Sequence, residues 1–419
     1  MLNDDVQFFC NIRMVIKSYN SPMLLAILMF LTVSLSAEKC PVSEVPLSDL
    51  EESVLQQSRL QVSADLLRTV AVQHSKQNVL LSPFTIHSAL LLLFFAASGD
   101  TELLLRKLLH IPDTLSKNKV LGQYLKERKA DELQGHGHKL INAYRLYVES
   151  GLDIRPCMTS LFPKEYYITN MTNQEVTAND IRYWIANETN NKIVLNPSWK
   201  SEFSFNTMVK STISINAAYF KGVWLNQFLE TETKKERFYT SNEEFYEVDM
   251  MTTSGFFTLW SDQDSPTKIL EIPYKGRTIS MIIVMPNQKH HEEVLHEFLY
   301  TFNNEDFEDV LRVLSKKIPT TVLVRLPKMV VEKEYNLEQV LNHLGGDLLF
   351  GAVTNFQDLF VKNRCITVLK TVLHNAKVEV DEEGSVKKDI ASKHRRKFIV
   401  NRPFAYFIYQ KPSKRVLFS

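Results

Sequence analysis

The chain has 419 residues, of which 44% are hydrophobic and 23% charged, an ordinary globular composition with enough apolar material for a large core. Its 49 basic residues balance its 48 acidic residues to a formal net charge of +1, which argues against a protein that binds nucleic acid through a basic field. No internal repeat or low-complexity linker divides the chain, so we expect one domain.

The N-terminal segment predicts export from the cell. Residues 23–33 form an uninterrupted apolar run, and small residues lead from there to a cleavage site near Ala37. Arg13 and Lys17 supply a basic flank if synthesis starts at Met1, and Lys17 alone supplies it from Met14. The run is too short to span a bilayer, and no later segment suggests a membrane span. We therefore predict a signal peptide with a possible upstream extension at 1–37, and a secreted domain at 38–419 with no membrane association.

The sequons and the cysteines are compatible with export from the cell. Two N-glycosylation sequons begin at Asn170 and Asn187, although such triplets also arise by chance. After removal of the signal, three cysteines remain, and their spacing matches neither a metal site nor a redox pair. They are Cys40, Cys157 and Cys365. One disulfide with a leftover thiol and three buried thiols both remain open.

Helical periodicity is strongest in the first third of the chain. Apolar residues recur on one face of 50–75, and 85–97 is nearly continuously apolar, which predicts a helix buried on most sides. Residues 98–101 should end that helix and cap another at 102–109. A short amphipathic helix is expected before the glycine pair at 345–346.

Strand signals dominate the rest of the chain. A hairpin is expected with its turn at 275–277, and Pro327 should end a strand, since proline cannot continue a central one. The mixture predicts an α+β fold with helices concentrated near the N-terminus. The predicted strands are 140–148, 211–220, 268–274, 278–285, 320–326, 366–380, 398–408 and 414–418.

Short motifs follow one another in a particular order along the chain. They include NVLLSPFTI at 78–86, NAAYFKGVW at 216–224, VDMM at 248–251, EIPYKG at 271–276, SMIIVMP at 280–286, LPK at 326–328, HNA at 374–376, EVDEEG at 379–384 and RPF at 402–404. In this order, over nearly the whole mature chain, they resemble the serpins, a family of serine protease inhibitors. Two departures are Tyr144, where serpins usually carry asparagine, and the end at Ser419, where serpins continue for a few residues.

The resemblance implies three β-sheets, about nine helices and an exposed reactive-centre loop at 384–402. In inhibitors of this family, a target protease cleaves the loop and is trapped as an acyl-enzyme while the loop enters the main sheet as a strand. The protein would then be an inhibitor-like protein and not an enzyme, with no catalytic residue, metal or cofactor. We expect a monomer.

The resemblance also assigns two groups of residues. The loop hinge falls on Glu382, Glu383, Gly384 and Ser385. A polar cluster beneath the opening of the main sheet falls on Ser82, Asn216 and His374. The alternative for the cluster is a buried hydrogen-bond network that only stabilises the fold.

The middle of the loop is chemically unsuited to insertion. Because strand side chains alternate between faces, one face would carry Lys387 and Asp389 and the other Lys388. Burying an unpaired charge costs several kcal/mol. The distance from Gly384 to Pro403 is also 19 residues, against roughly 25 in family inhibitors. We therefore predict a serpin that is weakly inhibitory or non-inhibitory.

The scissile bond is not fixed by the family pattern. Counting from the hinge gives Phe398, and counting back from Pro403 gives Ser392. Arg395 or Arg396, in the basic stretch 393–397, could instead fill the acidic pocket of a trypsin-like serine protease. The alternative is a solvated basic loop that happens to be cleavable.

Within the family, the signal, the start at Cys40 and the short charged loop look most like insect male accessory-gland serpins of seminal fluid, which suggests a protease decoy or substrate. Two alternatives remain, namely a working inhibitor of a trypsin-like protease with Arg395 or Arg396 as bait, and a non-inhibitory carrier of small ligands. The target protease, the tissue and the true start methionine stay open.

Two weaker signals concern ligands. Basic residues lie where some serpins bind sulfated polysaccharides, but interleaved acidic residues favour a solvated helix face. They are Lys117, Lys119, Lys126, Arg128, Lys129 and Lys139. The pairs His136 with His138 and His290 with His291 lack a third metal ligand at a useful spacing, so we expect surface loops there.

Overall fold

The computed structural model describes residues 45–132, 138–195, 210–241, 243–262, 265–287, 291–351, 354–361, 367–384 and 396–419. Nine α-helices and thirteen β-strands lie in these ranges, in an α+β arrangement. The predicted signal peptide, Cys10, Cys40, Cys365 and loop residues 385–395 lie outside them. In the described ranges, no helix is long and apolar enough to cross a membrane.

Five strands form the main sheet, in the spatial order β2-β1-β3-β10-β9. Their bounds are His138–Glu149 (β1), Tyr166–Thr169 (β2), Lys210–Gly222 (β3), Met329–Asn336 (β9) and Thr367–Val380 (β10). β3 and β10 run parallel and pair directly at twelve register positions, from Lys210 with Thr367 to Lys221 with Glu379. A strand added at the centre of this sheet would have to separate β3 from β10.

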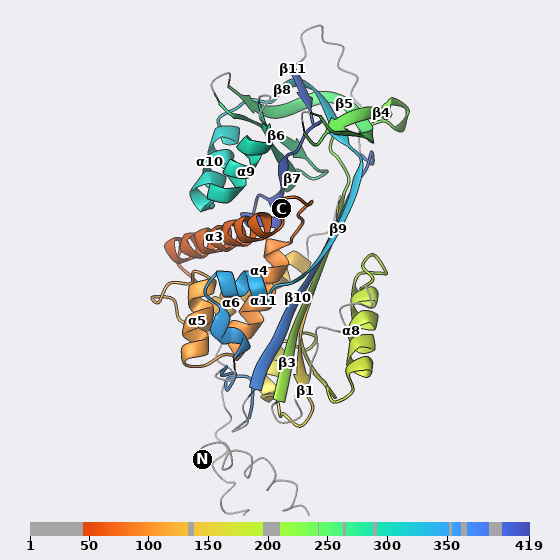
Figure 1. Ribbon diagram of the computed structural model, residues 1–419. Coiled ribbons are helices and arrows are strands. Elements are labelled where there is room, and N and C mark those ends of the chain that lie inside the picture. The colour runs from red at the N-terminus through yellow and green to blue at the C-terminus, as the bar shows by residue number, and fades with distance from the viewer. Residues whose placement is uncertain are drawn as a thin grey trace, which may run out of the picture.

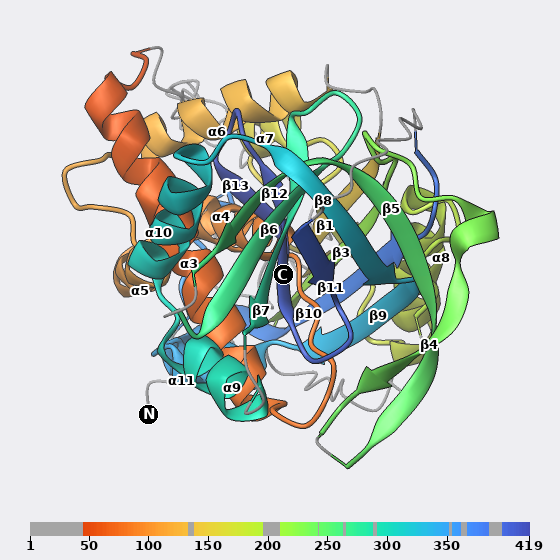
Figure 2. The same ribbon diagram turned by 90° about the horizontal axis from the view of Figure 1, so that it is seen from above.

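Eight further strands form a second sheet across the upper end of the first (Figures 1 and 2). Its order is β11-β8-β5-β6-β7-β12-β13, with β4 paired to β5. Residues 245–257 of β5 pair with β4 and β8, and residues 258–261 pair with β6, so this sheet is two sheets joined along one strand. With the main sheet they are the three predicted. The bounds are Lys234–Tyr239 (β4), Phe245–Ser261 (β5), Thr267–Pro273 (β6), Ile279–Pro286 (β7), Thr320–Pro327 (β8), Arg396–Ile399 (β11), Ala405–Gln410 (β12) and Arg415–Phe418 (β13).

Helices cover both faces of the main sheet (Figure 1). On one face lies α4, which begins because the Ser82 hydroxyl accepts the backbone N–H of Thr85 and Pro83 occupies the first turn. On the other face, Ile181 and Ile185 of α8 pack on Ile213 and Ile215 of β3. The bounds are Asp49–Gln73 (α3), Pro83–Ala96 (α4), Asp100–Leu108 (α5), Lys117–Glu132 (α6), Pro156–Leu161 (α7), Gln174–Glu188 (α8), His291–Thr301 (α9), Asn304–Ser315 (α10) and Glu338–His343 (α11).

Some expectations from the sequence were wrong in detail. The predicted strand 398–408 is two strands in different parts of the second sheet, because β11 pairs with β8 whereas β12 pairs with β7 and β13. Pro403, which lacks an N–H, lies in the break between them. The helix expected at 102–109 begins at Asp100 without a side-chain cap, after Gly99 in a positive-φ conformation. Helices α7 to α10 and strands β2, β4, β5 and β9 were not predicted.

Candidate functional site

The predicted opening cluster (Ser82, Asn216 and His374) comes together at the centre of the β3–β10 pairing. His374 of β10 and Asn216 of β3 are register partners, and the Nδ1 of His374 lies 2.5 Å from the Oδ1 of Asn216. The backbone N–H of Ser82, at the start of α4, donates to the Nε2 of His374 at 2.9 Å. The Nε2 is therefore an acceptor, which places the imidazole proton on Nδ1, where it donates to Asn216.

All three residues of the opening cluster are buried, with at most 1% of their surface exposed. Burial lowers the pKa of His374 to about 3, so the imidazole is neutral near neutral pH. The remaining polar atoms are also paired, because the Ser82 hydroxyl donates to the Leu417 carbonyl at 2.7 Å and the Asn216 amide donates to the Leu373 carbonyl at 2.9 Å. The cluster thus ties α4 and β13 to both central strands.

Two residues extend this network that the sequence did not single out. The hydroxyl of Thr85 lies 2.8 Å from that of Ser82 and donates to the Oδ1 of Asn142 at 3.1 Å. Asn142 and Tyr144 share a face of β1, since they are two residues apart. Tyr144 instead places its hydroxyl 2.6 Å from that of Tyr124 on α6. An asparagine thus joins this network two residues before Tyr144.

Residues 379–384, the N-terminal flank of the loop, extend the pairing of β10 beyond its end. Trp224, just after β3, forms a parallel bridge with Gly384, and its backbone N–H donates to the Glu383 carbonyl at 2.8 Å. The indole Nε1 of Trp224 donates to the Asp381 carbonyl at 2.7 Å. Its ring stacks on Tyr274 with centroids 4.3 Å apart, so the flank is fixed to a rigid aromatic pair.

Charged side chains hold the flank as well. Glu382 is buried and accepts from Lys328 at 2.8 Å and from the Thr233 hydroxyl at 2.9 Å. Burial alone would raise the pKa of Glu382, but the hydrogen bonds from Lys328 and Thr233 outweigh it and lower that pKa. Lys221 forms ion pairs with Asp381 at 2.8 Å and Glu383 at 2.9 Å, which raise the pKa of its ammonium group.

Gly384 is the last described residue before the loop, and the space around it admits only glycine. A Cβ on Gly384 would lie 2.4 Å from the Cα of Gln227, well inside contact distance. The backbone of the predicted hinge therefore packs directly against a neighbouring segment. Ser385, the fourth hinge residue, lies outside the described residues.

Comparison with known proteins decides the family. A family model described as serpin (serine protease inhibitor) matches residues 57–419. The chain is a serpin. Serine protease inhibitor 88Ea of Drosophila melanogaster is 28% identical over 387 residues, which cover 85% of this chain and 87% of that protein.

Solved serpins share the fold. Native protease nexin-1 with heparin superposes with a TM-score of 0.76 at 23% identity, covering 88% of this chain and 98% of that one. Human thyroxine-binding globulin in complex with its ligand gives a TM-score of 0.76 at 17% identity, covering 88% and 97%. Serpins are protease inhibitors and generally not enzymes, and the opening cluster and the flank are parts of the serpin fold.

The candidate bait residues fall on either side of a structural boundary. Arg396 is the first residue of β11 and pairs in register with Val322 of β8, so its backbone belongs to the edge of the second sheet. Phe398, the alternative scissile position, is buried in the same strand. Arg395, Ser392 and the charged residues 387–389 lie outside the described residues.

The remaining predicted sites are dispersed over the surface. Asn170 and Asn187 are both exposed, Asn170 before α8 and Asn187 in its last turn. Three of the basic residues on α6 already form ion pairs: Lys117 with Glu102 and Asp358, Lys119 with Glu51, and Arg128 with Glu165. Among the described residues, no group of three potential ligands could hold a metal ion. Cys157 is half-buried and is a free thiol.

Proposed function

We propose that this serpin is a secreted protein whose loop a trypsin-like serine protease cleaves as a decoy or substrate, with weak or no trapping of the protease. One observation carries the proposal. The loop would have to enter between the directly paired strands β3 and β10, where the sheet is covered on both faces, and its sequence would place charges on both faces.

Both faces of β3 are covered by other parts of the fold. Ala218 and Phe220 point into the core beneath the second sheet, whereas Ile215 and Tyr219 pack in the cluster under α8. A strand inserted beside β3 would alternate between the same two environments.

The loop sequence carries charged residues that would face both of these covered layers. In either register, Lys388 would face one covered layer, and Lys387 with Asp389 would face the other. The effective desolvation penalty is several kcal/mol per buried ion. Slow insertion lets the protease complete hydrolysis and leave, which turns an inhibitor into a substrate.

The position of Arg396 bears on where cleavage would occur. A protease binds its substrate in an extended conformation within its own site, so Arg396 would first have to leave β11 and its pairing with β8. Arg395 comes immediately before β11 in the sequence, so a cut after it involves one residue fewer of that strand than a cut after Arg396. We therefore favour Arg395 over Arg396 as the residue before the cleaved bond.

A working inhibitor of a trypsin-like protease is the second candidate, and the strand register supports it. Cleavage after Arg395 would release residues 385–395, which are eleven residues or about 36 Å of extended chain. The β3–β10 pairing covers twelve positions, so the released segment is long enough to occupy nearly all of it. Charge, rather than length, then becomes the obstacle to insertion.

Incubation with trypsin separates the two candidates. For a substrate, we expect loop cleavage without an SDS-stable complex, and a thermal midpoint that stays unchanged after cleavage. A covalent complex on a denaturing gel, or a large rise of the midpoint on cleavage, would instead establish the inhibitor. The expected cut after Arg395 is checked by mass spectrometry of the released C-terminal fragment.

Secretion is supported by the predicted signal and by the exposure of both sequons. We expect an expressed full-length chain to appear in the medium with Glu38 near its new N-terminus. A role in seminal fluid rests on resemblance and would be tested by locating the transcript. The likeness to protease nexin-1 with heparin suggests a polysaccharide site on α6. Lys117, Lys119 and Arg128 of α6 are already in ion pairs, however, so we expect polysaccharide binding less than protease cleavage.

A further inference from the structure

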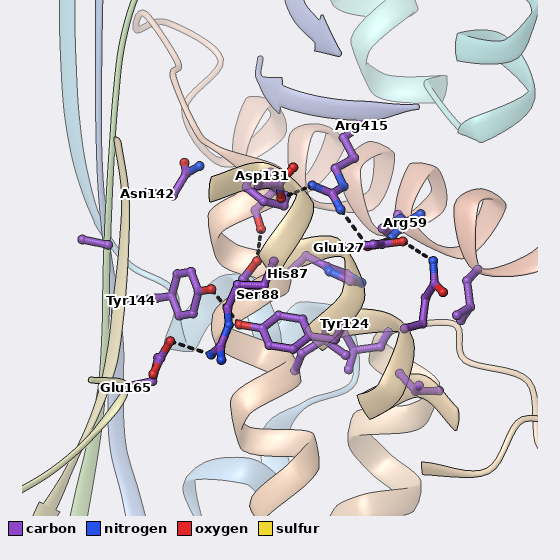
Figure 3. A pocket seen from close by; sticks show the side chains of 18 of the residues that line it. Arg59, His87, Ser88, Tyr124, Glu127, Asp131, Asn142, Tyr144, Glu165 and Arg415 are labelled. Atoms are coloured by element: carbon purple, nitrogen blue, oxygen red, sulfur yellow. Dashed lines mark hydrogen bonds and ion pairs between the residues drawn. The ribbon is translucent and has the colours of Figure 1, made fainter. Parts of the chain in front are cut away.

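A cavity of about 380 Å³ lies between α4, α6 and β1 (Figure 3). Its wall includes His87 of α4, Tyr124 of α6, and Asn142 and Tyr144 of β1. The volume falls in the range of about 300–1,000 Å³ that is usual for small-molecule sites. It corresponds to roughly a dozen waters at about 30 Å³ each. Residues 379–384 do not line it, so the cavity is separate from the reactive-loop flank.

The buried charges of the wall are already neutralised by one another. Every arginine in the wall lies within 2.9 Å of a carboxylate. Figure 3 shows Arg59 and Arg415 beside Glu127. The pairs are Arg59 with Glu127, Arg415 with Glu127 and Asp131, and Arg128 with Glu165. Burial alone would raise the pKa of Glu127, but Arg59 and Arg415 outweigh it and lower that pKa to about 2. A charged ligand that enters between these arginines would therefore have to break an existing pair or lose its hydration without compensation.

Two polar groups of the wall keep unused hydrogen-bonding capacity. His87 has no hydrogen-bond partner among the described residues, and burial together with Arg59 lowers its pKa to about 3. Its neutral imidazole thus offers one donor and one acceptor. Asn142 uses its carbonyl oxygen for Thr85, which leaves its amide N–H groups available. Around these groups lie the rings of Phe84, Tyr124 and Tyr144.

We propose that this cavity binds a small uncharged ligand with a flat apolar body and one or two hydrogen-bonding groups. The body packs against the aromatic rings, and the polar group bonds to His87 and Asn142. The proposal does not depend on whether the loop inhibits a protease, because its argument uses only residues of α4, α6, β1 and their ion-pair partners.

Two matched probes test the ligand class on the full-length chain. At pH 7, 2-naphthol is uncharged and 2-naphthoate is an anion on the same ring system. We expect isothermal titration calorimetry to show saturable binding of 2-naphthol and at least roughly tenfold weaker binding of 2-naphthoate, because the arginines of the wall are already paired and the one lysine, Lys164, is exposed to solvent. Equal or tighter binding of 2-naphthoate, or no binding of 2-naphthol at millimolar concentration, would overturn the proposal.

Variants test the location. His87→Leu should weaken 2-naphthol binding by roughly threefold to tenfold through loss of one hydrogen bond, with circular dichroism confirming the fold. His343→Leu, on an exposed position of α11, is the matched control and should leave the affinity unchanged. If His87→Leu does not fold, Asn142→Ala serves instead, with the same expected loss. Unchanged affinity in the folded cavity variant would contradict the assigned site.

Discussion

The neutral, buried His374 predicts a specific loss of stability in mild acid. Its pKa is about 3 in the folded chain and about 6.5 when unfolded, so below pH 6.5 the unfolded chain binds a proton that the folded chain does not. Above pH 6.5, His374 takes nothing from the free energy of unfolding. Below pH 6.5, that free energy falls steadily until the pH reaches about 3. A pH of 5.0 lies about 1.5 units below the pKa of the unfolded histidine. At 1.36 kcal/mol per unit, His374 then costs the folded chain about 2 kcal/mol of unfolding free energy.

The assay is urea unfolding of the uncleaved protein at pH 7.5 and pH 5.0, with wild type compared with His374→Gln. Other groups, including His87, also titrate, so the measured quantity is the difference between the two proteins in their loss of unfolding free energy. We expect wild type to lose about 2 kcal/mol more than the variant. His343→Gln, on an exposed position, should behave as wild type. Equal losses in wild type and His374→Gln, within about 0.5 kcal/mol, would refute the assignment of a buried neutral imidazole.

Three further predictions concern the loop and the surface. Replacing Lys387, Lys388 and Asp389 together by alanine should let the cleaved loop insert, raising the thermal midpoint after trypsin cleavage by roughly 5 °C or more relative to cleaved wild type. No added rise in the cleaved triple variant would show that these charges are not the obstacle. Gly384→Ala should lower the free energy of unfolding by about 1–3 kcal/mol in urea titrations, because its Cβ would overlap the backbone of Gln227. An unchanged midpoint would mean that the flank relaxes freely. Glutamine in place of the asparagine of either sequon should reduce the mass of the secreted protein by one glycan, and an unchanged mass would mean an unoccupied site.

The sequence was most informative where residue type and order suffice. The ordered motifs predicted the family fold, and the three residues of the opening cluster, taken from segments as far apart as Ser82 and His374, lie within hydrogen-bond distance. Local periodicity located α3 and α4 to within a few residues, because their apolar faces are long and continuous.

The sequence was least informative where the outcome depends on strand register. The contacts of Trp224 with Asp381 and of Glu382 with Lys328 join segments 157 and 54 residues apart, and nothing local in either segment indicates its partner. The division of 398–408 between two parts of the second sheet has the same origin, since both halves have strand-like composition and differ only in what they pair with.

Insertion of the loop has to overcome two separate barriers, the opening of the main sheet and the burial of the loop's charges. Opening the main sheet requires breaking the His374–Asn216 hydrogen bond and the twelve-position pairing of β3 with β10. Filling it then requires burying the charges of 387–389. Trp224 holds the flank beside the end of β3 through its bonds to Asp381 and Glu383, and these bonds are separate from the His374–Asn216 pair. Removing the three charges changes only the barrier to filling, whereas His374→Gln changes only the barrier to opening. If the triple variant inserts its cleaved loop and His374→Gln does not, the weak inhibition proposed here comes from the loop and the main sheet remains competent to open.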